Sequence, residues 1–229
     1  MRPALVVCAH GTDDSDGQAV VLAIAAAAAA RLPDVTVEVA YVDVQDPKLD
    51  VVVDRLVGAG HRVVVVPVLL TLGFHTEVDV AEAVAGHPGL VLSTGPLGPD
   101  PRLEAALVDR LREAGAPEGA AVVVAVAGSS RPEAAEVGHG VGRGVQERWA
   151  GPVTVGFLSA AEPRVPEAIA AARGERSVAV ASYLIGPGFF QRKLSRAGGD
   201  VVAQPLGAHP GLVSVVVDRY LSGCLCLEG

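Results

Sequence analysis

The stretch "PLGPDPRLEAALVDRL" (residues 96–111) returns later in the chain as "PLGAHPGLVSVVVDRY" (residues 205–220), with eight identical residues. "YVDVQDPKL" (41–49) returns in the same order as "FLSAAEPRV" (157–165), around a shared proline. An ordered match between two halves indicates an internal duplication of one unit rather than a short solenoid repeat. We therefore predict two similar domains, residues 1–115 and residues 116–229.

Each half alternates short apolar runs with stretches that favour helix. This alternation predicts an α/β fold in which each domain has a parallel sheet covered by helices, with a cleft between the two domains. In the first half the expected strands are 4–9, 35–42, 62–70 and 90–95, and the expected helices are 17–32, 46–60, 77–87 and 100–115.

Composition excludes several classes of protein. The formal charge of −8 argues against a nucleic-acid partner, and no apolar run reaches the roughly 20 residues of a membrane span. Cys8 lies in an expected strand, and Cys224 and Cys226 lie near the end of the chain, so no disulfide framework is expected. We expect a cytoplasmic protein with no membrane partner, a monomer with two pseudo-twofold halves.

The charge is unevenly divided. Residues 1–115 contain 8 Lys and Arg against 16 Asp and Glu, whereas residues 116–229 contain 10 of each kind. All the excess negative charge therefore belongs to the first half, where an acidic field would concentrate cations.

Polar groups follow two expected strands of the first half. His10 comes directly after the first strand, and "LTLGFHTEVDV" (70–80) places His75, Glu77 and Asp79 after the third. Ligands of parallel α/β sheets bind beyond the carboxyl ends of the strands. Two neutral imidazoles at that edge can bind Fe²⁺, Co²⁺ or Ni²⁺ in an open, exchangeable site.

The duplication supplies an internal control for these residues. Ala127 stands in place of His10, and Phe190 stands in place of His75. The fold therefore does not need either imidazole, which favours a functional role for both. Asp79 is likewise replaced, by Leu194.

The two motifs resemble those of a known family. His10-Gly11-Thr12, together with Pro67 and the later Gly73-Phe74-His75-x-x-x-Asp79, is similar to the sirohydrochlorin chelatase and cobaltochelatase family of class II tetrapyrrole chelatases. The resemblance covers the whole chain and is to the long, duplicated form. In "YVDVQDP" (41–47), Asp43 takes the acidic place of the family's Phe-Leu-Glu segment.

The resemblance implies a lyase that inserts Fe²⁺ or Co²⁺, or else Ni²⁺, into sirohydrochlorin without ATP, for siroheme or cobalamin biosynthesis. The metal is then a substrate, and no tightly bound cofactor is expected. His10 and His75 would together bind the metal and remove the two pyrrole protons, since neutral histidine is a suitable base near neutral pH. Asp43, Glu77 and Asp79 would relay protons or orient His75; alternatively, Glu77 and Asp79 are acids favoured by a helix N-terminus.

The second half carries basic residues where the first half is acidic. "GFFQRKLSR" (188–196) contains Arg192, Lys193 and Arg196, and Arg131 follows the first strand of that half. These side chains either hold carboxylates of the macrocycle or form an ordinary solvated helix face. Two other functions stay open: a non-enzymatic metal or tetrapyrrole carrier, in which Cys224 and Cys226 bind soft metal, and a ferrochelatase for another porphyrin.

Overall fold

A computed structural model describes the backbone of residues 2–71, 74–129 and 132–228, and the side chains of these residues except 74–77, 132–134 and 228. It contains two four-stranded sheets in which every pair of neighbouring strands is parallel. The strand orders are β2-β1-β3-β4 and β6-β5-β7-β8. The α/β architecture with two similar parallel sheets is thus confirmed.

The elements of the two repeats follow one another in the same order. The first repeat comprises β1 (Ala4–Ala9), α1 (Ser15–Arg31), β2 (Val37–Tyr41), α2 (Leu49–Gly58), β3 (Val63–Pro67), α3 (Phe74–Ala85), β4 (Val91–Ser93) and α4 (Pro101–Glu113). The second comprises β5 (Ala121–Val126), α5 (Pro132–Gln146), β6 (Val153–Phe157), α6 (Val165–Ala172), β7 (Val178–Tyr183), α7 (Phe189–Leu194), β8 (Val201–Val202) and α8 (Pro210–Glu228).

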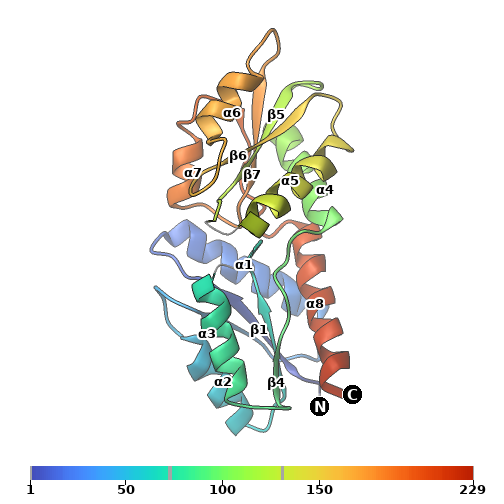
Figure 1. Cartoon of the computed structure of the whole chain (residues 1–229). Helices are drawn as coiled ribbons and strands as arrows, with labels where there is room; N and C mark the ends of the chain where they lie inside the picture. Colours follow the sequence, from blue (N-terminus) through green and yellow to red (C-terminus); the bar gives the residue numbers. More distant parts are fainter. Residues whose placement is uncertain (1, 72–73, 130–131, 229) are drawn as a thin grey trace. The chain divides into compact units, whose positions relative to one another are not determined.

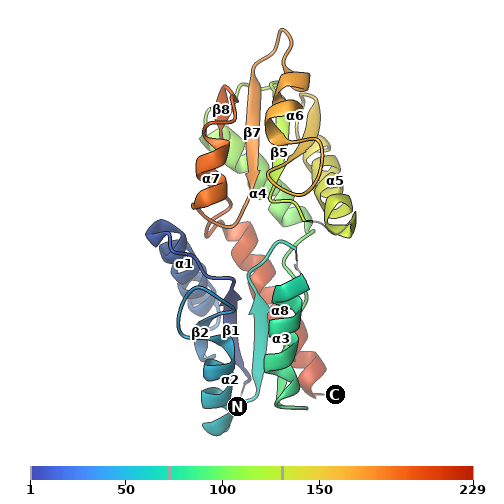
Figure 2. The same ribbon diagram turned by 60° about the vertical axis from the view of Figure 1, so that its left-hand side comes forward.

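The repeats exchange their last helices. One compact unit (unit 1) consists of residues 1–97 and 212–229, and the other (unit 2) consists of residues 98–211. In both views the red α8 lies with β1 to β4, and the green α4 lies with the elements of unit 2 (Figures 1 and 2). The compact units therefore differ from the predicted division at residue 115, because α4 leaves its own repeat and α8 returns to the first.

Each sheet is buried on both faces, as parallel sheets require. In unit 1, alternate residues of β1 such as Val6 and Cys8 pack with Val52 and Leu56 of α2 in one apolar cluster. In unit 2 the equivalent cluster joins Val123 of β5 to α6 and α7. The sheet face covered by α2 and α3 in unit 1 is therefore equivalent to the sheet face covered by α6 and α7 in unit 2.

The helix α8 completes the core of unit 1. A Cβ atom added at Gly223 would meet the side chains of Val64 and Leu92, so α8 approaches β3 and β4 closely at this glycine. By length and composition alone residues 210–227 could cross a bilayer, and a third of this window is buried in the structure. The buried part of α8 includes Leu212, Val213, Val215, Val216 and Tyr220, so core packing explains these apolar residues.

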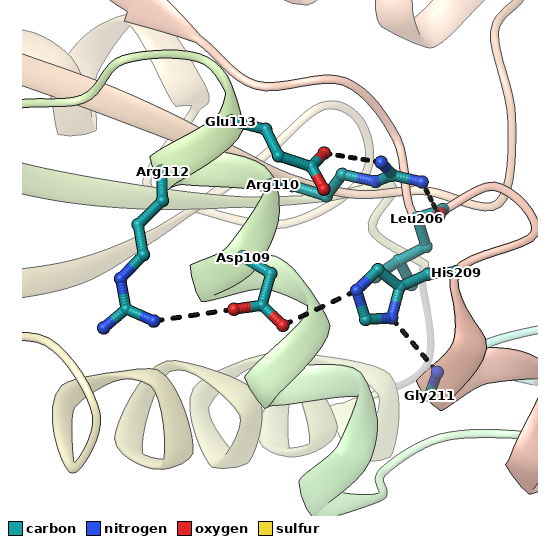
Figure 3. A network of polar contacts seen from close by, with 7 residues as sticks. All are labelled: Asp109, Arg110, Arg112, Glu113, Leu206, His209 and Gly211. Carbon is teal, nitrogen blue, oxygen red and sulfur yellow. Dashed lines mark hydrogen bonds and ion pairs between the residues drawn. The ribbon is translucent and has the colours of Figure 1, made fainter.

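A polar network fixes α4 to the segment that leads into α8 (Figure 3). The Arg110 guanidinium donates to the carbonyl oxygen of Leu206 at 2.8 Å and pairs with Glu113 at 2.6 Å. The imidazole of His209 lies 3.5 Å from the Asp109 carboxylate. These contacts link the beginning of unit 2 to its end and hold the segment from which the chain returns to unit 1.

Candidate active site

His10 and Asp43 lie side by side at the carboxyl edge of the first sheet. The backbone N–H of Asp43 donates to the carbonyl oxygen of His10 at 2.9 Å, which continues the pairing of β1 with β2. On the other side of β1, the N–H of Val68 donates to the carbonyl oxygen of Cys8 at 2.7 Å. The turn after β1 is thus flanked by Asp43 and by the segment that leads to α3.

The glycine after His10 is required by the fold. Gly11 has φ +100°, and a Cβ atom there would overlap the carbonyl oxygen of Asp43. Gly128 occupies the same place in unit 2, with φ +84° and the same overlap with Ser159. The close turn is therefore common to both repeats, whereas only the first repeat places a histidine before it.

Both polar side chains at this edge are exposed. His10 Nδ1 lies 3.4 Å from the carbonyl oxygen of Gly11, and the imidazole is open to solvent. The Asp43 carboxylate accepts the N–H of Val44 at 2.7 Å and lies 4.0 Å from the Lys48 ammonium. An imidazole and a carboxylate are thus both open to solvent on neighbouring backbone segments.

Cys8 does not contribute a thiolate to this edge. Its side chain is fully buried in β1, and burial raises the pKa of the thiol to about 12. Because the thiolate is the form that binds metal, a neutral buried thiol acts here as a small apolar core residue.

Position 75 lies in the first turn of a helix rather than at a strand end. The strand β3 ends at Pro67, and α3 begins at Phe74, three residues before the predicted start at residue 77. Position 79 follows position 75 by one helical turn, so the two positions share a face of α3. The side chains of His75 and Glu77 lie outside the described residues, and their pairing with His10 stays a prediction.

Within the described residues, no three His, Cys, Asp or Glu side chains converge on one point that could hold a metal ion. The predicted metal site depends on His75, which is outside that set. The described part of the site therefore consists of His10, the neighbouring Asp43 and the backbone turn at Gly11.

Asp79 faces α2. It lines a hollow of about 410 Å³ together with Lys48, Asp50 and Glu82, and the same Lys48 approaches Asp43. His10 is not among the described residues that line this hollow. Of the three carboxylates predicted to assist the histidines, the structure places Asp43 next to His10 along the backbone and Asp79 in the hollow that Lys48 also lines.

The predicted basic residues gather around a cavity in unit 2. Arg192 and Lys193 of α7, with Arg196 just after it, line a cavity of about 830 Å³. Arg131 lies outside the described residues. Sequence reasoning missed Arg164 and Phe189, which line the same cavity. The repeat contained the signal for Arg164, because "DPKL" (46–49) matches "EPRV" (162–165) and so pairs Lys48 with Arg164.

Comparison with known proteins gives a separate match to each repeat. The sequence pattern of the CbiX family matches residues 4–114 and matches again over residues 121–222. The chain belongs to the CbiX family. A curated relative, the sirohydrochlorin ferrochelatase of Bacillus subtilis (strain 168), is 26% identical over 248 aligned residues, which cover 100% of this chain and 95% of the relative.

Solved structures share the fold of this CbiX-family chain. SirB from Bacillus subtilis with Fe³⁺ superposes with a TM-score of 0.86 at 22% identity, covering 100% of this chain and 98% of SirB. The sirohydrochlorin chelatase SirB from Bacillus subtilis subspecies spizizenii in complex with cobalt gives a TM-score of 0.83 at 19% identity, with the same coverage. Both superpositions cover the two repeats in full.

Proposed function

We propose that the chain is a sirohydrochlorin chelatase, which inserts a divalent metal, Fe²⁺ or Co²⁺, into the free macrocycle without ATP. The observation that carries the proposal is the asymmetry of the repeat. Both repeats build the same glycine turn, but only the first places an imidazole, His10, on it and a carboxylate, Asp43, beside it. Membership of the CbiX family and the whole-chain match to a sirohydrochlorin ferrochelatase support this reading.

The reaction explains why an open edge with imidazole ligands is suitable. The incoming ion must be held while its water ligands leave, and it must then be released into the macrocycle, so a closed four-ligand cage would be a trap. His10 and His75 are proposed to hold the ion through neutral imidazole nitrogens. Divalent metal is therefore a substrate of this site.

Proton removal is the second requirement. Two pyrrole N–H groups must lose their protons as the metal enters, and neutral histidine accepts protons near neutral pH. Asp43 is proposed to orient His10 or to relay the proton onward. Asp79, one turn beyond position 75 on α3, and Glu77 are proposed to assist His75 in the same way.

The basic residues of unit 2 are proposed to hold the carboxylates of sirohydrochlorin, which bears acetate and propionate groups. Unit 1 contains 6 Lys and Arg against 14 Asp and Glu, whereas unit 2 contains 12 of each kind. The acidic unit thus attracts the metal, and the basic residues Arg131, Arg192, Lys193 and Arg196 attract the macrocycle. We propose that the enzyme acts as a monomer in the cytoplasm, where its three cysteines stay free.

The test is metal insertion by purified protein. Metal-free sirohydrochlorin and Co²⁺ are mixed with the wild type under anaerobic conditions, and the change of the macrocycle absorbance is followed. We expect His10→Ala to lower the rate by roughly 100-fold, as for loss of a general base. His87→Ala, which removes a histidine paired with the exposed Asp54 and lining neither hollow, should leave the rate unchanged. A wild type that binds both substrates but gives no rate above the uncatalysed reaction would be a carrier rather than a chelatase.

A further inference from the structure

The cavity between α6 and α7 has the size of a small-molecule site. Its volume of about 830 Å³ falls within the roughly 300–1,000 Å³ that such sites occupy. Apolar and basic side chains share its lining. The apolar ones are Phe157, Leu158, Val165, Pro166, Phe189 and Ala197; the basic ones are Arg164, Arg192, Lys193 and Arg196.

The helix α7, which carries two of the four basic residues, is held firmly. Gln191 of α7 is buried, accepts a hydrogen bond from the Ser182 hydroxyl at 2.7 Å, and donates to the carbonyl oxygen of Ala203 at 3.0 Å. The Lys193 ammonium donates to the carbonyl oxygen of Leu158 at 2.7 Å, across the cavity wall. A wall fixed in this way loses little conformational entropy when a ligand binds.

The charge of the lining favours an anion. Four basic side chains face a single acidic one, Glu167. Arg164 also pairs with Glu162 at 3.0 Å, but the contact of Lys193 is to a neutral carbonyl oxygen, which does not cancel its charge. The cavity as a whole therefore carries positive charge toward whatever enters it.

The equivalent hollow of unit 1 carries the opposite charge. Its described lining contains one basic residue, Lys48, and three acidic ones, Asp50, Asp79 and Glu82. Both spaces lie between the second and third helices of their repeats, so the fold sets the space but not its charge. The positive lining in unit 2 is thus a property of this repeat alone.

An aromatic ring stands open at the same cavity. Phe189 is 71% exposed, although a phenylalanine of this exposure gains little from folding. It meets Phe190 edge to face, with ring centroids 5.5 Å apart, and this contact limits its rotation. An exposed, oriented ring next to cations offers a stacking surface for a flat conjugated ligand.

We propose that the α6–α7 cavity is a binding site for the tetrapyrrole macrocycle, in which Phe189 stacks on the ring and Arg164 and Arg196 bind peripheral carboxylates. The inference rests on the proposed function and adds to it two positioning residues, Arg164 and Phe189, and a preference for heavily carboxylated macrocycles. The apolar lining recognises the conjugated ring, and the basic residues distinguish macrocycles by their number of carboxylates.

The test uses two metal-free probes, the octacarboxylate uroporphyrin III and the tetracarboxylate coproporphyrin III, whose binding is followed by porphyrin fluorescence. We expect Arg196→Glu to raise the Kd of uroporphyrin about tenfold, and that of coproporphyrin less, because a charge-assisted hydrogen bond is lost and a repulsion is added. Arg196→Lys should retain most of the affinity. Phe189→Ser should raise the Kd of both probes by a similar factor, since stacking does not depend on the carboxylates. Arg143→Glu makes the same charge change at an exposed position of α5 outside this cavity, and should have little effect.

The outcomes separate this inference from the proposed function. If Arg196→Glu weakens uroporphyrin no more than Arg143→Glu does, or if the wild type does not bind uroporphyrin, the cavity is not the macrocycle site, whatever the rate of metal insertion. If the wild type binds uroporphyrin with the expected pattern but inserts no metal into sirohydrochlorin, the site stands and the chelatase proposal fails.

Discussion

Tyr220 of α8 donates its buried hydroxyl to the carbonyl oxygen of Pro3 at 2.7 Å, joining residues that are 217 positions apart. The contact lies within unit 1, just before β1 begins. It fixes the returning C-terminal helix to the strand that carries His10 at its other end. The exchange of helices between repeats is therefore secured by a specific hydrogen bond as well as by apolar packing.

Removing this hydroxyl should destabilise the protein. We expect Tyr220→Phe to lower the free energy of unfolding by about 1–2 kcal/mol, because the Pro3 carbonyl loses its buried partner. Tyr183→Phe is a matched control: Tyr183 is equally buried, and its hydroxyl has no hydrogen-bond partner among the described residues. Urea unfolding should show no loss for Tyr183→Phe. Equal losses for the two variants would mean that the Tyr220 hydrogen bond contributes nothing specific.

Gly11→Ala should damage both stability and metal insertion. The new Cβ atom would overlap the Asp43 carbonyl oxygen at a residue with positive φ, and we expect a loss of about 2 kcal/mol or more. The turn that holds His10 beside Asp43 would shift as well. Gly58→Ala is the control, because no atom lies within 4 Å of a Cβ atom at this residue of α2 and alanine favours helix. Urea unfolding followed by circular dichroism gives the free energy of unfolding of both variants. A Gly11→Ala variant as stable as the wild type would show that the fold does not need this glycine.

A buried carboxyl of unit 2 should make stability depend on pH. Glu104 of α4 is 8% exposed and lies 3.3 Å from Arg148, and burial raises the pKa of its carboxyl despite the opposing arginine. A raised pKa means that the folded state binds the proton more tightly. The resulting stabilisation is complete below the unfolded pKa, at about pH 4, and is lost as pH rises through the folded pKa.

Glu104→Gln removes this titration. We expect the free energy of unfolding of the wild type, measured relative to Glu104→Gln, to fall as the pH rises above about 4. Asp200→Asn should show the opposite trend, because the Val178 N–H and Arg173 lower the pKa of Asp200, so that its contribution is lost as pH falls. Urea titrations of the three proteins at each pH give the differences. If the stability of the wild type relative to Glu104→Gln stays constant or rises with pH, the pKa of Glu104 is not raised in the folded protein.

The duplication and the parallel sheets could be predicted from sequence because each rests on local pattern. The exchange of α4 and α8 could not, because the two helices share a sequence pattern that does not say which of the two sheets each helix covers. The difference in length between α3 and α7 was not predicted either. Gly198, with φ +94°, and Gly199 follow the six residues of α7, whereas α3 continues through Ala83 and Val84 at the matching positions.

The candidate site was predictable in part for a similar reason. The position of His10 beside Asp43 follows from the parallel register of β1 and β2, which the strand–helix alternation implies. The position of Asp79 does not follow, because it depends on where α3 begins and which face it turns toward α2. Sequence spacing thus predicted the positions of residues at strand ends, but it could not predict which way the side chains on α3 face.

The last prediction concerns competition between protons and metal. If His10 and His75 both bind the ion as neutral imidazoles, each must release a proton before binding at acidic pH. At a pH low enough that both imidazoles of the metal-free protein are protonated, the affinity of the wild type for Co²⁺ should then rise about 100-fold per pH unit. His10→Ala leaves one imidazole, so its affinity should be weaker and should rise only about tenfold per pH unit.

The slope separates a ligand from a bystander, because a variant that only distorts the site weakens binding without changing the number of protons released. Isothermal titration with Co²⁺ between pH 5 and 6, in buffers that do not bind the metal, gives this number directly. His139→Ala is the control, since it removes one exposed imidazole from unit 2 and should keep both the affinity and the slope of the wild type. A His10→Ala variant that keeps the full slope would show that His10 is not a metal ligand. The role of His10 would then be limited to proton removal, and the metal would have to be held by His75 together with groups other than His10.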